Sequence, residues 1–153
     1  MNDILWRALK TAQVLAVKEP VSLTHENGKR PDGVTLLPWA RGKPLARHVT
    51  VPDTYADSHL ADAATLAGAA ADKAASTKET KYKQLANSHV FVPVAIETAG
   101  TWNSLAMELT QELGRRITAV TDDPRRTCFM FQRLSVALQR GNAVSFCSTF
   151  ITE

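Results

Sequence analysis

The sequence contains only two cysteines in 153 residues, Cys128 and Cys147. Two cysteines without metal-ligand spacing provide no disulfide framework, so a reducing, intracellular compartment is expected. The four histidines, at positions 25, 48, 59 and 89, also lack the spacing of zinc ligands, which excludes a structural zinc site. No apolar run approaches the roughly 20 residues of a transmembrane helix, so no membrane partner is expected.

Glycine is also scarce, and none of the seven glycines forms a phosphate-binding loop or a nucleophile elbow. The first six residues lack a basic region ahead of an apolar segment and do not indicate a secretory signal. A chain that is 44% hydrophobic and 22% charged is typical of a soluble globular protein. Its length favours a single domain over residues 1–153. The net charge of +3 permits contact with nucleic acid without requiring it.

The pattern of apolar residues predicts alternating helices and strands. Helical spacing covers about 3–17, 103–113 and 126–140, and β-branched runs at 33–38, 45–51 and 90–96 predict strands. The alanine-rich segment 58–87 predicts one long helix, with Gly68 as the place where it would break. Pro93 places its strand at a sheet edge or a bulge. We therefore expect a mixed α/β (α+β) domain, a small mixed sheet flanked by helices, with a core at about 3–100 and a helical extension at about 101–150.

Two residues near the first two strands are candidates for chemistry. Asp32 directly precedes the first strand, where a carboxylate is placed to bind Mg²⁺, although Pro-Asp-Gly by itself is more often a turn. His48 lies in the middle of the second strand, and alternation places it on one face with Ala46 and Thr50. A single histidine in that position is more often structural than catalytic. Neutral imidazole binds transition metals but is a poor ligand for Mg²⁺.

Several charged residues have both a functional and an ordinary interpretation. Lys78 and Lys81 lie on the alanine-rich helix, where they would assist at a phosphate or form a solvated face. Glu97 follows the third strand and fits a site residue, a helix cap or a loop equally well. Arg115-Arg116 and the Arg125-Arg126 pair fit phosphate contacts or a plain surface.

Taken together, segments spread over nearly the whole chain resemble, in order, a known nuclease family. The matching segments are 2–7, 18–20, 28–39 with Lys29-Arg30-Pro31-Asp32-Gly33 at its centre, 49–54, 81–82, 91–98, 113–116 and 132–142. The set resembles the restriction-like endonuclease domain found downstream of the reverse transcriptase in some non-LTR retrotransposons, within the PD-(D/E)xK superfamily. The Pro-Asp pair alone is a weak signal, and the ordered set is the specific one.

The resemblance implies Mg²⁺- or Mn²⁺-dependent nicking of target DNA. It also implies a reverse transcriptase domain as partner in the parent element, and a nuclear location for an active copy. Asp32 would be the first metal ligand, position 48 the second, and Lys81 the lysine that serves in place of one at Thr50. The residues expected to contact DNA are Lys29, Arg30, Lys78, Lys83, Arg115 and Arg116.

The chain departs from the family pattern because His48 stands where the second acid is expected. This replacement removes one negative charge and one hard oxygen ligand from a site for a divalent cation. Asp53 and Glu97 are the acids that would compensate for the missing ligand. Asp53, however, lies beyond the end of the second strand, and alternation places it on the opposite face from position 48. Two hypotheses therefore stand: an endonuclease with partial compensation, or a catalytically dead nucleic-acid-binding or relic domain. The sequence leaves the oligomeric state open.

Overall fold

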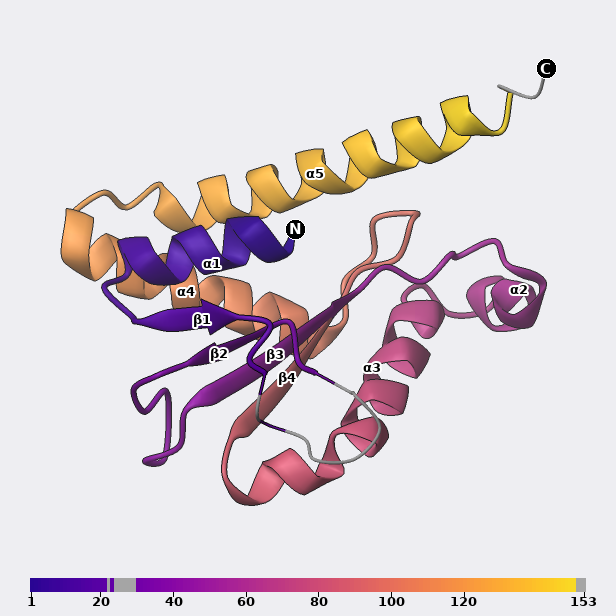
Figure 1. Ribbon diagram of the computed structural model, residues 1–153. Coiled ribbons are helices and arrows are strands. Elements are labelled where there is room, and N and C mark those ends of the chain that lie inside the picture. The colour runs from indigo at the N-terminus through magenta and orange to yellow at the C-terminus, as the bar shows by residue number, and fades with distance from the viewer. Residues whose placement is uncertain (22, 24–29, 151–153) are drawn as a thin grey trace.

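The computed structural model describes residues 1–21, 23 and 30–150 (Figure 1). Its order of elements is a helix, three strands, two helices with a short 3₁₀ turn, a fourth strand and two long helices. The helices are α1 (Asn2–Thr11), α2 (Asp57–Ala63), α3 (Ala69–Lys81), η1 (Lys83–Asn87), α4 (Ser104–Thr121) and α5 (Arg126–Ser148). The expected mixed α/β fold with a small mixed sheet and flanking helices is confirmed. None of the helices in this described part combines the length and the apolar character that crossing a bilayer requires.

The sheet has four strands in the order β1-β2-β3-β4, with β1 (Ala16–Lys18), β2 (Gly33–Thr35), β3 (Leu45–Thr50) and β4 (Val90–Ala95). The first three strands pair antiparallel, and β3 pairs parallel with β4. Pro93 lies opposite His48 in that register, on a strand at the edge of the sheet, as predicted. An edge strand has one side free of ladder bonds, so it tolerates a residue without an N–H group.

Helices cover both faces of the sheet. The pair α1 and α5 lies over one face together with α4, and α3 lies against the other (Figure 1). The larger core cluster is on the first face and joins Leu5, Leu9, Leu45, Val94, Leu109, Leu113 and Leu134. The second face carries two smaller clusters, one around Ala46 and Tyr82 and one of small alanines below α3. The two C-terminal helices thus contribute to the same core as α1.

Alternation along β3 sends neighbouring side chains to different layers. Leu45 belongs to the cluster under α1, α4 and α5, whereas Ala46 packs with Tyr82 on the α3 side. Arg47 then contacts α1 through Asn2, and His48 contacts Tyr82. The structure confirms the two faces predicted from the sequence.

The structure differs from the prediction at several element ends. The first helix stops at Thr11, because Gln13 adopts a left-handed backbone with φ 59°, and the chain then forms β1 where a helix was expected. Strand β2 ends at Thr35 instead of extending to 38. The long alanine-rich helix is divided at Gly68, whose φ of 90° starts α3. Helices α4 and α5 extend beyond their predicted C-terminal ends.

Candidate functional site

The backbone of Asp32 is fixed from three directions at the start of β2. Its N–H donates to the carbonyl of Arg47 at 2.9 Å, which places it directly beside β3. Its carbonyl accepts hydrogen bonds from the backbone N–H of Glu19 at 3.1 Å and from the side-chain Nδ2 of Asn2 at 3.2 Å. The position of Asp32 is therefore set by main-chain contacts to β3, to the segment after β1 and to α1.

The carboxylate of Asp32 faces the side of the sheet that α3 covers. Oδ2 accepts the backbone N–H of Val49 at 2.7 Å, and Oδ1 lies 3.3 Å from Nδ1 of His48. The His48 and Asp32 atoms are within ion-pair distance but are not aligned as a hydrogen bond, and they attract as opposite charges only where the imidazole is protonated. Burial works to raise the pKa of Asp32, but the contacts with His48 and Val49 and the charge of Arg47 outweigh it, and the pKa lies below its usual value.

Aromatic packing holds the His48 ring in place. Its centroid lies 5.5 Å from that of Tyr82, and Tyr82 in turn packs 4.8 Å from Phe91. The hydroxyl of Tyr82 donates to the carbonyl of Arg30 at 2.7 Å, which ties the loop before Asp32 to the end of α3. Burial, with a contribution from the charge of Asp32, raises the pKa of Tyr82, so this hydroxyl stays a donor at neutral pH.

Two lysines in the last turn of α3 lie on the same side of the sheet as Asp32 and His48. Lys81 places its ammonium 5.2 Å from the ring centroid of Tyr82. Burial and the nearby charge of Lys81 lower the pKa of Lys78, and the carboxylate of Asp32 opposes that shift. Lys78 therefore lies within reach of both charges, since Asp32 attracts its ammonium and Lys81 repels it. Lys83 is exposed on η1, next along the chain.

The two acids that would compensate for His48 are used elsewhere. Glu97 is buried, and its carboxylate accepts the N–H of Ala71 in the first turn of α3 at 3.1 Å and the hydroxyl of Thr54 at 3.2 Å. The structure therefore uses Glu97 to cap a helix. Asp53 accepts the N–H of Tyr55 at 3.0 Å and the hydroxyl of Thr98 at 3.2 Å. Both acids lie beyond the ends of β3 and β4, and neither has a polar contact with Asp32.

The donor set around Asp32 does not fit Mg²⁺. No group of three or more His, Cys, Asp or Glu side chains converges on one point among the residues that the structure describes. Oδ2 of Asp32 is engaged by a backbone N–H, and the next ligand position holds a nitrogen. Mg²⁺ requires near-octahedral oxygen coordination and is a poor match for imidazole. The pair of Asp32 and His48 thus offers Mg²⁺ one carboxylate, where the family pattern has two.

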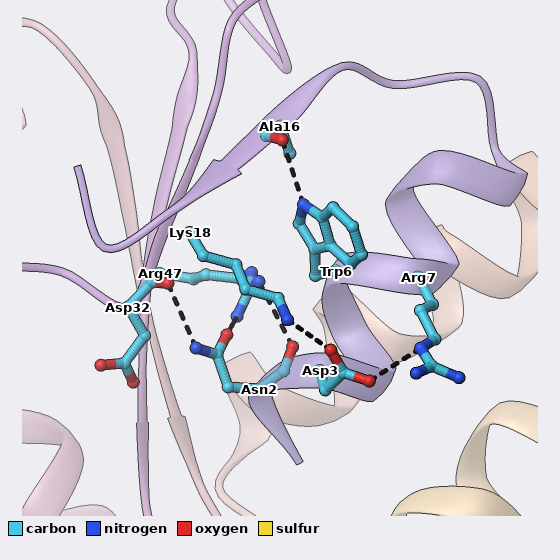
Figure 2. A network of polar contacts seen from close by, with 8 residues as sticks. All are labelled: Asn2, Asp3, Trp6, Arg7, Ala16, Lys18, Asp32 and Arg47. Atoms are coloured by element: carbon cyan, nitrogen blue, oxygen red, sulfur yellow. Dashed lines mark hydrogen bonds and ion pairs between the residues drawn. The ribbon is translucent and has the colours of Figure 1, made fainter.

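The residues that sequence reasoning passed over are Asn2 and Arg47, which join α1 to the site from the opposite face (Figure 2). The guanidinium of Arg47 is 1% exposed and donates to the side-chain oxygen of Asn2, whose Nδ2 donates to Asp32. Burial lowers the pKa of Arg47 to about 10, against the opposing charge of Asp32, so Arg47 remains cationic at neutral pH. The sequence feature that could have revealed Arg47 is an arginine at a strand position that faces the core.

Gly33 explains how so large a side chain fits beside Asp32. A Cβ at this position would lie 2.7 Å from Nη2 of Arg47, so the guanidinium packs directly over the glycine. Asn2 accepts a hydrogen bond from this guanidinium, and the backbone carbonyl of Arg47 accepts one from the N–H of Asp32. Arg47 and Asp32 are therefore both held beside the glycine. The glycine of the Pro-Asp-Gly sequence is therefore explained by close packing inside β2.

The two predicted DNA-contacting arginines of α4 lie apart from Asp32. Arg115 and Arg116 both pair with Glu112, at 2.7 and 2.6 Å, and Arg116 also stacks 3.7 Å over the ring of Trp39. Arg30 is exposed in the loop before Asp32. Lys29 lies outside the described residues. The structure thus brings Asp32, His48 and Lys78 together, with Lys81 over the ring of Tyr82, and places the α4 arginines in a separate group that shares one carboxylate.

Neither a protein-family model nor a curated protein matches this chain.

Proposed function

We propose that this chain is a retroelement-derived, endonuclease-like domain that binds DNA phosphates at the α3 face of its sheet, and that His48 silences Mg²⁺-dependent nicking. The observation that carries the proposal is the position of His48. Its Nδ1 lies 3.3 Å from Oδ1 of Asp32, in the place where a second carboxylate would share a cation. The resemblance of the ordered sequence segments supports the nuclease ancestry.

The charge around the pair favours an anion over a cation. Lys78 and Lys81 lie in the last turn of α3, and the charges of Lys81 and Asp32 both act on Lys78. Arg47 acts on Asp32 from the opposite face, where it is buried. On the α3 face two lysines therefore outnumber one carboxylate, which favours a phosphate over a divalent metal. Phosphate contacts of this kind provide sequence-independent affinity for DNA. DNA is the partner that this role requires, and the role implies a nuclear location. In the parent element, a reverse transcriptase domain would belong to the same chain as this domain.

The test is DNA binding measured by fluorescence anisotropy at several salt concentrations. We expect the double variant Lys78→Gln/Lys81→Gln to bind more weakly and to reduce the salt dependence by about one phosphate contact per lysine. Lys73→Gln is the matched control, because Lys73 lies on the same helix but donates to the Ser58 carbonyl. Equal binding by the native protein and the double variant would contradict the proposal.

A nuclease that uses a different metal is the second candidate, and one feature of the pair favours it. Asp32 and His48 present an oxygen and a nitrogen toward each other, a donor pair that suits transition metals such as Mn²⁺ better than Mg²⁺. Nicking by the native protein with Mn²⁺, abolished in both Asp32→Ala and His48→Ala, would support this candidate. Mn²⁺-dependent nicking that persists in His48→Ala would exclude a role for the imidazole.

A further inference from the structure

A second charged site lies in the helical layer on the other side of the sheet from His48. A surface pocket of about 50 Å³ opens between α1, α4 and α5. Its lining comes from Arg7, Ala8, Thr11, Ile117, Arg126, Phe129, Met130 and Arg133. Three arginines therefore meet at one small cavity, and no carboxylate lines it. Figure 2 shows Arg7 turned away from the network that Asn2 forms with Arg47.

Carboxylates near the rim do not balance this charge. Asp3 pairs with Arg7 at 2.7 Å, and Asp123 lies 3.3 Å from Arg126. Asp3 also pairs with Lys18, and Asp123 also pairs with Arg125. The structure gives Arg133 no ion pair with any described residue. The pocket is thus surrounded by an excess of positive charge in a chain whose net charge is only +3.

Arg126 adds an unsatisfied donor. Its Nε is buried and makes no hydrogen bond within the described structure, because its contact with Asp123 is not aligned as one. Buried donors in folded proteins nearly always have a partner. A guanidinium presents its N–H groups in a planar fork that matches two oxygens of a phosphate. An oxyanion in the pocket would give Arg126 the acceptor that it lacks.

The walls of the pocket determine what fits. Ala8, Ile117, Phe129 and Met130 form its apolar sides, whereas the side chains of Arg7 and Arg126 are 65% and 40% exposed. A volume of 50 Å³ is on the order of one to two water molecules. The pocket therefore admits one or two oxygens of a tetrahedral oxyanion, whose other oxygens stay at the open surface, and it is too small for a base or a sugar.

We infer that the pocket formed by Arg7, Arg126 and Arg133 is a binding site for a phosphate group. This inference goes beyond the proposed function, because the pocket belongs to the helical layer and does not depend on what the α3 face binds. The group is either free inorganic phosphate or a terminal phosphate of a nucleic acid, which have the same oxyanion chemistry.

The experiment is a titration of the full chain with inorganic phosphate, followed by NMR of the arginine Nε–H signals. We expect saturable shifts at Arg126 and Arg133, and an affinity at least about tenfold weaker in Arg126→Gln/Arg133→Gln, because two charge-assisted forks are lost. Arg126→Lys keeps the charge without the fork and is expected to fall between the two. Arg125→Gln is the control, because Arg125 pairs with the same Asp123 but does not line the pocket.

Two oligonucleotides, one with a 5′-phosphate and one with a 5′-hydroxyl, identify the source of the group. Tighter binding of the phosphorylated strand that disappears in Arg126→Gln/Arg133→Gln assigns the pocket to nucleic-acid ends. Saturation by inorganic phosphate alone assigns it to the free ion. The absence of saturable shifts with either ligand, in protein whose unfolding curve is native, would overturn the inference. Lys78→Gln/Lys81→Gln is expected to weaken DNA binding at the α3 face while the phosphate-induced shifts of Arg126 and Arg133 persist, so failure of this inference is distinguishable from failure of the proposed function.

Discussion

Arg47 and His48 are neighbours on β3, yet their surroundings differ in kind. Arg47 points toward α1, is 1% exposed and is held by Asn2. His48 points toward α3, keeps 17% of its side chain exposed and lies between Asp32 and Tyr82. One face of the strand thus encloses its charge in a polar network, and the other leaves its charged groups within reach of solvent.

This difference separates the positioning of Asp32 from its chemistry. The backbone of Asp32 is fixed by Arg47, Glu19 and Asn2, none of which depends on residue 48. Only the carboxylate reaches the α3 face, where it meets His48. The residue at position 48 can therefore change without removing the backbone contacts that hold Asp32.

The largest stability effect is expected from Asn2→Ala. This variant removes the side-chain acceptor of a buried guanidinium and the donor to the Asp32 carbonyl, so it leaves an N–H group of Arg47 unpaired in the core. We expect a loss of about 3 kcal/mol of unfolding free energy, measured by urea denaturation. His48→Ala on the opposite face is the matched variant and is expected to cost less than about 1 kcal/mol. Equal losses of unfolding free energy in the two variants would contradict the difference between the two faces of β3.

A second expected effect concerns the helical layer over the Arg47 face. A Cβ at Gly114 in α4 would lie 2.5 Å from the Cα of Thr127 in α5, so Gly114→Ala must push the two helices apart. We expect a loss of about 2 kcal/mol in thermal or urea unfolding. Gly141→Ala is the control, since nothing lies within 4 Å of its Cβ, and it is expected to gain about 0.5 to 1 kcal/mol from helix propensity. A neutral Gly114→Ala would show that α4 and α5 are not closely packed at this point.

The smallest expected effect is the pH dependence that Asp32 contributes. Its pKa is lower in the folded protein than in the unfolded chain, so its ionised form stabilises the fold above an unfolded pKa of about 3.9. That contribution is lost as the pH falls through the folded pKa. Asp32→Asn keeps an oxygen for the N–H of Val49 but cannot ionise. We expect the stability of the native protein to fall more steeply than that of Asp32→Asn below about pH 4. Parallel curves would show that ionisation of Asp32 contributes no stability.

Local patterns in the sequence predicted the parts of the fold that depend on neighbouring residues. The alternation of β3, the break at Gly68 and the place of Asp32 before a strand are all local features. The short strand β1 was read as helix, because its three residues become a strand only by pairing with β2. The role of Glu97 as a cap on α3 also depends on contacts between residues far apart in the chain.

The candidate site was predictable to a similar extent. Asp32, His48 and the lysines of α3 follow from strand parity and helix spacing, and the structure brings them to one face. The link from Arg47 through Asn2 to Asp32 spans 45 residues and has no local pattern beyond an arginine among apolar neighbours. The pocket of Arg7, Arg126 and Arg133 joins two helices from opposite ends of the chain, so only the folded structure reveals it.

The most direct measurement is a plasmid-nicking assay with Mg²⁺ that compares the native chain, His48→Asp and His48→Asp/Asp32→Ala. The account predicts no nicking by the native chain. It predicts an increase of orders of magnitude in His48→Asp, because a second oxygen ligand completes a cation site, and loss of that activity in the double variant. Mg²⁺-dependent nicking by the native chain that Asp32→Ala abolishes would contradict the claim that His48 silences the site.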